Sequence, residues 1–74
     1  SWTSWEMHPV GEEVVICTAG CMTLHQEFAD GARATVVLAA GDYAINPRGA
    51  WHTADVDGSA SAIFMTCGAG TEHR

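Results

Sequence analysis

Two short segments of the chain carry side chains of the kinds that bind metals. Glu6 and His8 are two positions apart, so on a strand both would point to the same face. A Pro-Val-Gly turn then reverses the chain, and Glu13 begins the next extended segment. His52 follows a second turn, of sequence Pro-Arg-Gly, much later in the chain. Two imidazoles and one or two carboxylates that converge from strands predict a site for one divalent transition metal, without distinguishing Mn, Fe, Ni, Cu and Zn.

The segments that must position these side chains predict an all-β fold. Turn residues recur between short runs of β-branched and aromatic residues, such as residues 14–18 and 35–38, at intervals typical of a sandwich or barrel. The best helical candidate, residues 32–40, is short and contains a Thr-Val-Val run. Asp30-Gly31 and Asp57-Gly58 are expected to form two-residue hairpin loops. We expect about seven strands, over residues 3–8, 13–19, 21–28, 33–38, 43–46, 51–56 and 61–66.

The first metal-binding segment resembles a motif of the cupins, the double-stranded β-helix barrels. That motif reads G-x5-H-x-H-x(3,4)-E-x6-G. The chain matches its spacing from Glu6 through His8 and Glu13 to Gly20, with Glu6 in place of the first His. The motif's leading Gly would fall before residue 1, so the resemblance implies a barrel with a minimal N-terminal part.

The second segment resembles the other cupin motif, G-x5-P-x-G-x2-H-x3-N. Gly41, Pro47, Gly49 and His52 match it at every step, and Val56 replaces the final Asn. Glycines where strands reverse, Gly20 and Gly41, are expected to adopt positive φ. The resemblance covers about residues 6–66 and implies one cupin domain over residues 1–74, with a jelly-roll barrel. It implies metal ligands at His8, Glu13 and His52, with Glu6 at the place of the remaining His.

The ligand set implied by the resemblance leaves the function open between classes. His8, Glu13 and His52 would form a two-His, one-carboxylate set like that of non-haem Fe(II) oxygenases. This implies oxygenase, isomerase or lyase chemistry on a small molecule, although cupins host many activities. The alternatives are a non-catalytic small-ligand or sensor module and a vestigial, truncated barrel. Glu6 would make the site neutral and less Lewis-acidic, or would hydrogen-bond a bound water or substrate.

Several other side chains have simpler expected roles. Taken without the motifs, His8 and His52 would be interpreted as hydrogen-bonded or exposed histidines on a β-surface. His25 and His73 are expected in solvent, and Trp51 is expected to pack on the face opposite His52. Tyr43 and Phe64 are expected in the core or lining the barrel.

Charge and cysteine content limit the binding partners and the cellular compartment that we expect for the chain. The net charge is −6, and the three arginines are scattered, which excludes a phosphate-binding face and therefore nucleic acid. No uncharged stretch reaches the roughly 20 residues of a membrane span, and no secretory leader is visible. The odd number of cysteines predicts free thiols in a reducing, cytoplasmic setting. They are Cys17, Cys21 and Cys67, of which Cys17 has the parity to face the barrel as an additional soft ligand.

The N-terminal segment predicts self-association. Only residues 1–5 precede the first motif, which would leave an unpaired sheet edge. Trp2 and Trp5 would be exposed there. We therefore expect a homodimer that covers this edge by an isologous interface.

Overall fold

The fold is all-β, with six strands and no helix in the part of the chain that is described. The structure is a computed structural model and describes residues 4–74, apart from the side chain of Asp57. No apolar helix of membrane-spanning length occurs among these residues. The strands are β1 (Glu6–Met7), β2 (Glu13–Glu27), β3 (Arg33–Ala39), β4 (Tyr43–Asn46), β5 (Trp51–Thr66) and β6 (Glu72–His73).

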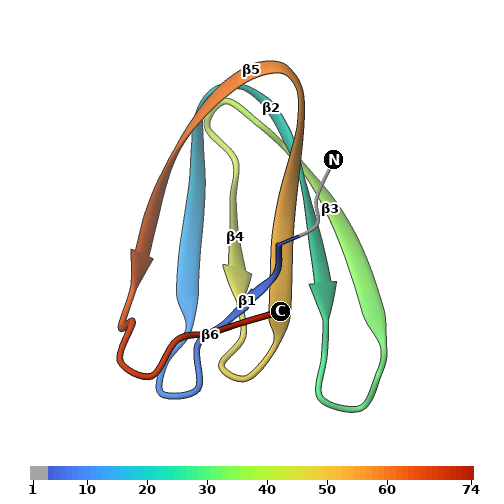
Figure 1. The fold of residues 1–74 in the computed structure, drawn as a ribbon. Helices are drawn as coiled ribbons and strands as arrows, with labels where there is room; N and C mark the ends of the chain where they lie inside the picture. Colours follow the sequence, from blue (N-terminus) through green and yellow to red (C-terminus); the bar gives the residue numbers. More distant parts are fainter. Residues whose placement is uncertain (1–3) are drawn as a thin grey trace.

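The strands form a single antiparallel sheet that folds over on itself. The order is β3-β2-β5-β1-β6, and β4 pairs with β2. Figure 1 shows β2 and β5 arching over together, so that each contributes to two facing halves of the sheet. Residues 13–16 of β2 lie between β4 and the second half of β5. Residues 22–27 lie between β3 and the first half of β5.

The arch corrects the expected number of strands. Segments 13–19 and 21–28, predicted as separate strands, form one strand, and so do segments 51–56 and 61–66. Gly20 has the predicted positive φ of 74°, but it bends β2 instead of reversing the chain. The β2–β5 register shifts on either side of it, which marks bulges that bend a strand and leave its pairing intact. A Cβ at Gly20 would lie 2.3 Å from the backbone oxygen of Ser59, so a side chain is excluded there.

The two predicted Asp-Gly hairpin loops have different outcomes. Asp57-Gly58 lies inside β5, so the loop predicted there is wrong, although Gly58 has a φ of 94°. Asp30-Gly31 does connect β2 to β3, but the loop is longer than two residues. It is closed by a hydrogen bond from Phe28 N to Ala32 O, and Asp30 Oδ1 accepts from Ala32 N. The turns at Gly41 and Gly49 are as expected, with φ values of 94° and 79°.

The apolar core is small and lies between the two halves of the sheet. Alternate residues of β2 point inward, as the period of two requires. Tyr43 and Phe64, expected in the core or lining the barrel, are 66% and 53% exposed. Tyr43 points outward opposite Ile16, whereas Phe64 lines an open cavity. The buried apolar residues are Val15, Cys17, Met22, Leu24, Leu38 and Ala50.

The N-terminal edge is not open at Trp5. β1 pairs with β5 on one side and with β6 on the other. Trp5 and Arg74 exchange two backbone hydrogen bonds of 2.9 and 3.0 Å, and the Arg74 guanidinium lies 4.5 Å from the ring centre of Trp51. The expectation of an exposed Trp5 on an unpaired edge is therefore wrong, and Trp2 lies outside the described residues. The homodimer itself stays a prediction, although the argument from an open edge at Trp5 no longer supports it.

Candidate metal centre

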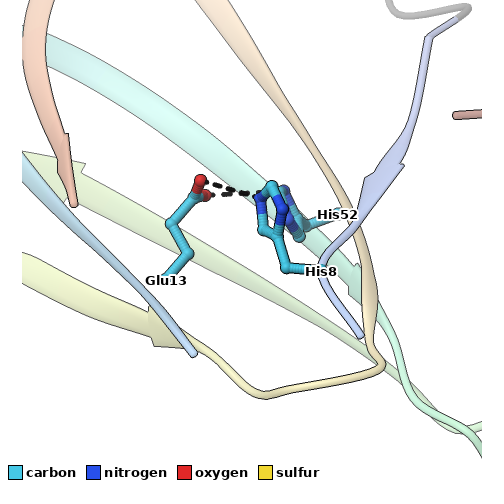
Figure 2. A group of neighbouring side chains, drawn as sticks. All are labelled: His8, Glu13 and His52. Atoms are coloured by element: carbon cyan, nitrogen blue, oxygen red, sulfur yellow. Dashed lines mark hydrogen bonds and ion pairs between the residues drawn. The ribbon is translucent and has the colours of Figure 1, made fainter. Parts of the chain in front are cut away.

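Three of the predicted ligands meet in the interior, between the two halves of the sheet. His8 follows β1, Glu13 is the first residue of β2 and His52 is the second residue of β5. Each is 6% exposed or less. One ligand atom from each residue lies within 4.8 Å of the others. Figure 2 shows the carboxylate of Glu13 directed at the two neighbouring imidazoles.

The distances within this group are close to those of a metal site. Glu13 Oε2 lies 3.1 Å from His8 Nε2, and Glu13 Oε1 lies 3.7 Å from His52 Nδ1. The two imidazole rings have centroids 5.0 Å apart. Atoms that bind one ion at about 2.1 Å lie roughly 3.0–3.4 Å from one another. The three ligand atoms lie within 4.8 Å of one another, so side-chain movements of up to about 1.4 Å would bring His8, Glu13 and His52 onto a common ion.

The hydrogen bonds of Thr71 fix the tautomer of His8. The Thr71 hydroxyl is 2.7 Å from Gly68 O and donates its hydrogen there. Its oxygen can then only accept from His8 Nδ1, at 2.8 Å. A neutral His8 consequently has its lone pair on Nε2, directed at the Glu13 carboxylate. Two acceptors 3.1 Å apart repel each other unless a proton or a metal ion lies between them.

A chain of amides holds Glu13 in place. Asn46 Nδ2 donates to Glu13 Oε1 at 2.9 Å, and Gln26 Nε2 donates to Asn46 Oδ1 at 2.8 Å. Gln26 Nε2 also bonds Ile45 O at 3.0 Å. Asn46 and Gln26 are both buried, and they connect β4 to the far half of β2. The amide of Asn46 thereby fixes the orientation of the Glu13 carboxylate beside the two imidazoles.

Burial keeps His52 in the form that binds metals. Loss of solvent lowers the pKa of His52, and the negative charge of Glu13 opposes this only in part. The neutral imidazole is the ligand form. Its Nε2 atom is buried and has no hydrogen-bond partner among the described residues. An orphaned nitrogen of this kind is rare in folded proteins, but the His52 nitrogen that faces Glu13 is the other one, Nδ1.

Glu6 lies at the rim of the group and not inside it. Glu6 Oε1 is 4.0 Å from His8 Nε2, and Glu6 Oε2 pairs with His73 Nε2 at 3.1 Å. The Glu6 side chain is 45% exposed. His73, expected in solvent, is exposed but paired, and His25 is half-buried with its Nδ1 atom 3.4 Å from Thr35 Oγ1. A ligand role for Glu6 stays a prediction.

The remaining predicted side chains lie apart from the group. Cys17 faces the interior as its parity predicts, but its thiol points to Ala19 O at 3.5 Å and is not part of the His-Glu-His group. Cys21 and Cys67 are exposed, and all three cysteines are free thiols in the structure. Trp51 alternates with His52 and packs under Arg74, as expected for a residue on the opposite face.

Sequence reasoning missed three residues that support the group: Gln26, Asn46 and Thr71. Gln26 has the same parity as the buried Met22 and Leu24, which was the available indication that it faces inward. The sequence around Asn46 and Thr71 contains no comparable indication, because their partners are 33 and 63 positions away.

An open cavity of about 530 Å³ adjoins the group. Glu6, Glu13 and His52 are its titratable lining residues, and Met22, Leu24 and Phe64 are among its apolar walls. Val56, which replaces the motif's Asn, also lines it. Its described lining contains no Lys or Arg. The cavity can therefore admit a small molecule to the metal-binding group but offers it no cationic side chain.

Comparisons with known proteins assign neither a family nor a function to the chain. No protein-family model matches the chain, and neither a curated protein nor a solved structure matches it.

Proposed function

We propose that this chain binds one divalent transition-metal ion through His8, Glu13 and His52 and presents it to a small molecule in the adjoining cavity. The observation that carries the proposal is the buried convergence of two imidazoles and a carboxylate within 4.8 Å. Two features support it: the Thr71 hydrogen bond that directs the lone pair of His8 inward, and the burial that lowers the pKa of His52 and favours its neutral, metal-binding form. A bound ion would supply Lewis-acid or redox chemistry.

We further propose that the fold is a minimal cupin-type barrel. Support comes from both motifs: His8, Glu13 and His52, the residues that the resemblance implies as ligands, are those that meet in the interior. The arching of β2 and β5 into two facing halves is compatible with a jelly roll. The divergence at Val56 removes one polar group from the cavity and favours an apolar ligand.

The cavity favours a small, uncharged and largely apolar ligand. A volume of about 530 Å³ is within the range of small-molecule sites. With a divalent ion bound, the carboxylates of Glu6 and Glu13 would bring the site to a net charge of zero, and the described lining has no cationic side chain to attract an anionic ligand. A ligand with neutral oxygen or nitrogen donors could instead approach the metal while its apolar part contacts Leu24 and Phe64.

A substitution at Glu6 can distinguish an enzyme from a protein that only binds a ligand. Among the described cavity residues it is the only titratable side chain outside the proposed ligand set, and it is exposed enough to exchange protons with solvent. If there is turnover, Glu6 is therefore the group that would accept or donate a proton. A Glu6→Gln variant that keeps its metal but loses turnover would identify an enzyme, whereas ligand binding without turnover in wild type would identify a binding module.

Thermal melting with added ions tests the metal proposal. An ion at 100 times its Kd adds about 2.7 kcal/mol to the free energy of unfolding. We expect Mn(II), Fe(II), Ni(II) or Zn(II) to raise the Tm of wild type and not that of His52→Ala. His25→Ala is the matched control, because His25 is also on a strand but lies outside the group. If no ion raises the wild-type Tm, the group is a hydrogen-bonded remnant and the barrel is vestigial.

A further inference from the structure

The outer surface of one half of the sheet carries two apolar rows. Val14 of β2 is opposite Ile45 of β4 and Met65 of β5. Ile16 of β2 is opposite Tyr43 of β4 and Ile63 of β5. All six alternate with inward-pointing residues, so they share the outer face. We call this set the apolar face: Val14, Ile16, Tyr43, Ile45, Ile63 and Met65.

The apolar face is large for so small a protein. Its outermost members, Tyr43, Ile63 and Met65, are 66%, 51% and 51% exposed. With side chains of these sizes the six residues expose roughly 400–500 Å² in total, which is within the range of the largest apolar patch on a typical monomer, a patch that is often functional. That is about a tenth of the 4357 Å² surface of the molecule, the share that a partner typically covers on a small protein.

We propose that a second copy of this chain covers the apolar face. A standard interface buries about 800 Å² on each partner, so the face would supply its apolar centre, and the surrounding turns would supply its rim. Two sheets can stack face to face at a spacing of about 10 Å, which places the two rows of one copy on those of the other. A two-fold axis would bring the same six residues of both copies together, as an isologous interface requires.

Charge limits how a second copy can bind. Each copy has a net charge of −6, which opposes association, so the contact has to come from a surface without charge. The apolar face has no ionisable group other than the phenol of Tyr43. An anionic membrane would be repelled, because none of the six residues is basic and the molecule is acidic. A partner recruited by opposite charge would find nothing to pair with on this face.

The small apolar core is a further reason to expect association through the apolar face. The described chain buries only six apolar residues, of which Cys17 and Ala50 are small. Chains of this size bury about 60% of their unfolded surface and are marginal as monomers. Association through the apolar face would add a second apolar layer on the far side of the half that carries Glu13.

Sedimentation velocity between 1 and 200 µM tests the proposal, with Val37→Glu as the matched control. Val37 is 63% exposed on β3, in the other half of the sheet. We expect wild type and Val37→Glu to sediment with twice the 7.8 kDa mass of one chain. Ile63→Glu should sediment as one chain, with a dimer Kd raised about 100-fold or more, since the charge enters a two-fold interface twice. Circular dichroism confirms that each variant is folded.

Tyr43→Ser provides a second, milder perturbation at the edge strand β4, should Ile63→Glu fail to fold. It should weaken the dimer by about 10-fold or more, because a buried Tyr is a frequent hot spot. The measurements are made with and without Mn(II), so that a failure of the metal proposal does not affect them. A wild-type chain that stays at 7.8 kDa throughout, whether or not it binds vesicles or another protein, overturns the proposal. So does a dimer that survives both substitutions.

Discussion

Replacing Thr71 by Val tests whether the histidine tautomer matters for metal binding. Thr71 Oγ1 is the acceptor for His8 Nδ1 at 2.8 Å, and the residue is otherwise half-buried in the turn before β6. Valine has nearly the same shape but accepts no hydrogen bond. Without the acceptor, His8 is free to carry its proton on Nε2, where it blocks the lone pair that an ion needs.

The expected loss of metal affinity follows from removing one hydrogen-bond partner of a metal-binding histidine. Such losses raise the Kd for the metal by about 10–100-fold. With an ion at 100 times the wild-type Kd, wild type gains about 2.7 kcal/mol, while a variant with a 30-fold weaker site gains only about 0.9 kcal/mol. A change of 1 kcal/mol shifts the Tm of a domain this small by about 4–8 °C. We therefore expect the metal-induced rise in Tm to fall by about two-thirds in Thr71→Val.

Isothermal titration of metal into each variant separates affinity from stability. Thr71→Ser keeps the hydroxyl and should bind within about 3-fold of wild type, which makes it the matched control. The metal-free Tm of Thr71→Val is measured as well, because the variant also loses the hydrogen bond to Gly68 O. If Thr71→Val lowers the metal-free Tm but binds the ion like wild type, the residue is structural only and the tautomer argument is wrong.

Three further predictions concern the bend, the amide chain and pH. Gly20→Ala should lower the free energy of unfolding in urea by more than about 2 kcal/mol, because the new Cβ would lie 2.3 Å from a backbone oxygen at a residue with positive φ. Gly41→Ala also has a positive φ but open space around the Cβ, so it should lower this free energy by only about 1 kcal/mol. Asn46→Ala removes the donor to Glu13 and should destabilise by about 1–3 kcal/mol, with weaker metal binding in the same titration. Because burial lowers the pKa of His52, the unfolded chain takes up more protons as pH falls below about 6.5, so metal-free stability should decrease there, and His52→Gln should flatten this dependence.

The sequence contained enough information to predict the fold class and the three converging residues. Alternation in β2 follows from the strand period, and it correctly placed Cys17 on the inward face, which Glu13 shares. The two motifs then predicted that His8 and His52 would lie near that carboxylate, which they do. These predictions succeeded because they depend on local spacing, or on a pattern that encodes a long-range arrangement.

The parts that failed depend on long-range pairing. A glycine with positive φ suits a tight hairpin and a bulged bend equally well, so Gly20 and Gly58 predicted reversals that the structure replaces with bends. Only the continuous register between β2 and β5 decides between the two. The Asn46 hydrogen bonds could not be predicted either, since they require two halves of the sheet to face each other.

Metal content after equilibrium dialysis tests the central claim most directly. The exposed thiols of Cys21 and Cys67 could bind soft ions, so wild type and His52→Ala are both prepared with Cys21→Ser and Cys67→Ser. Each is dialysed against micromolar Mn(II) or Zn(II) and then analysed for metal per chain. We predict about one ion per chain for the parent and almost none for His52→Ala, because a site with two remaining ligands binds weakly. Equal metal in both proteins, or none in the parent, would contradict the proposal that His8, Glu13 and His52 form a metal centre.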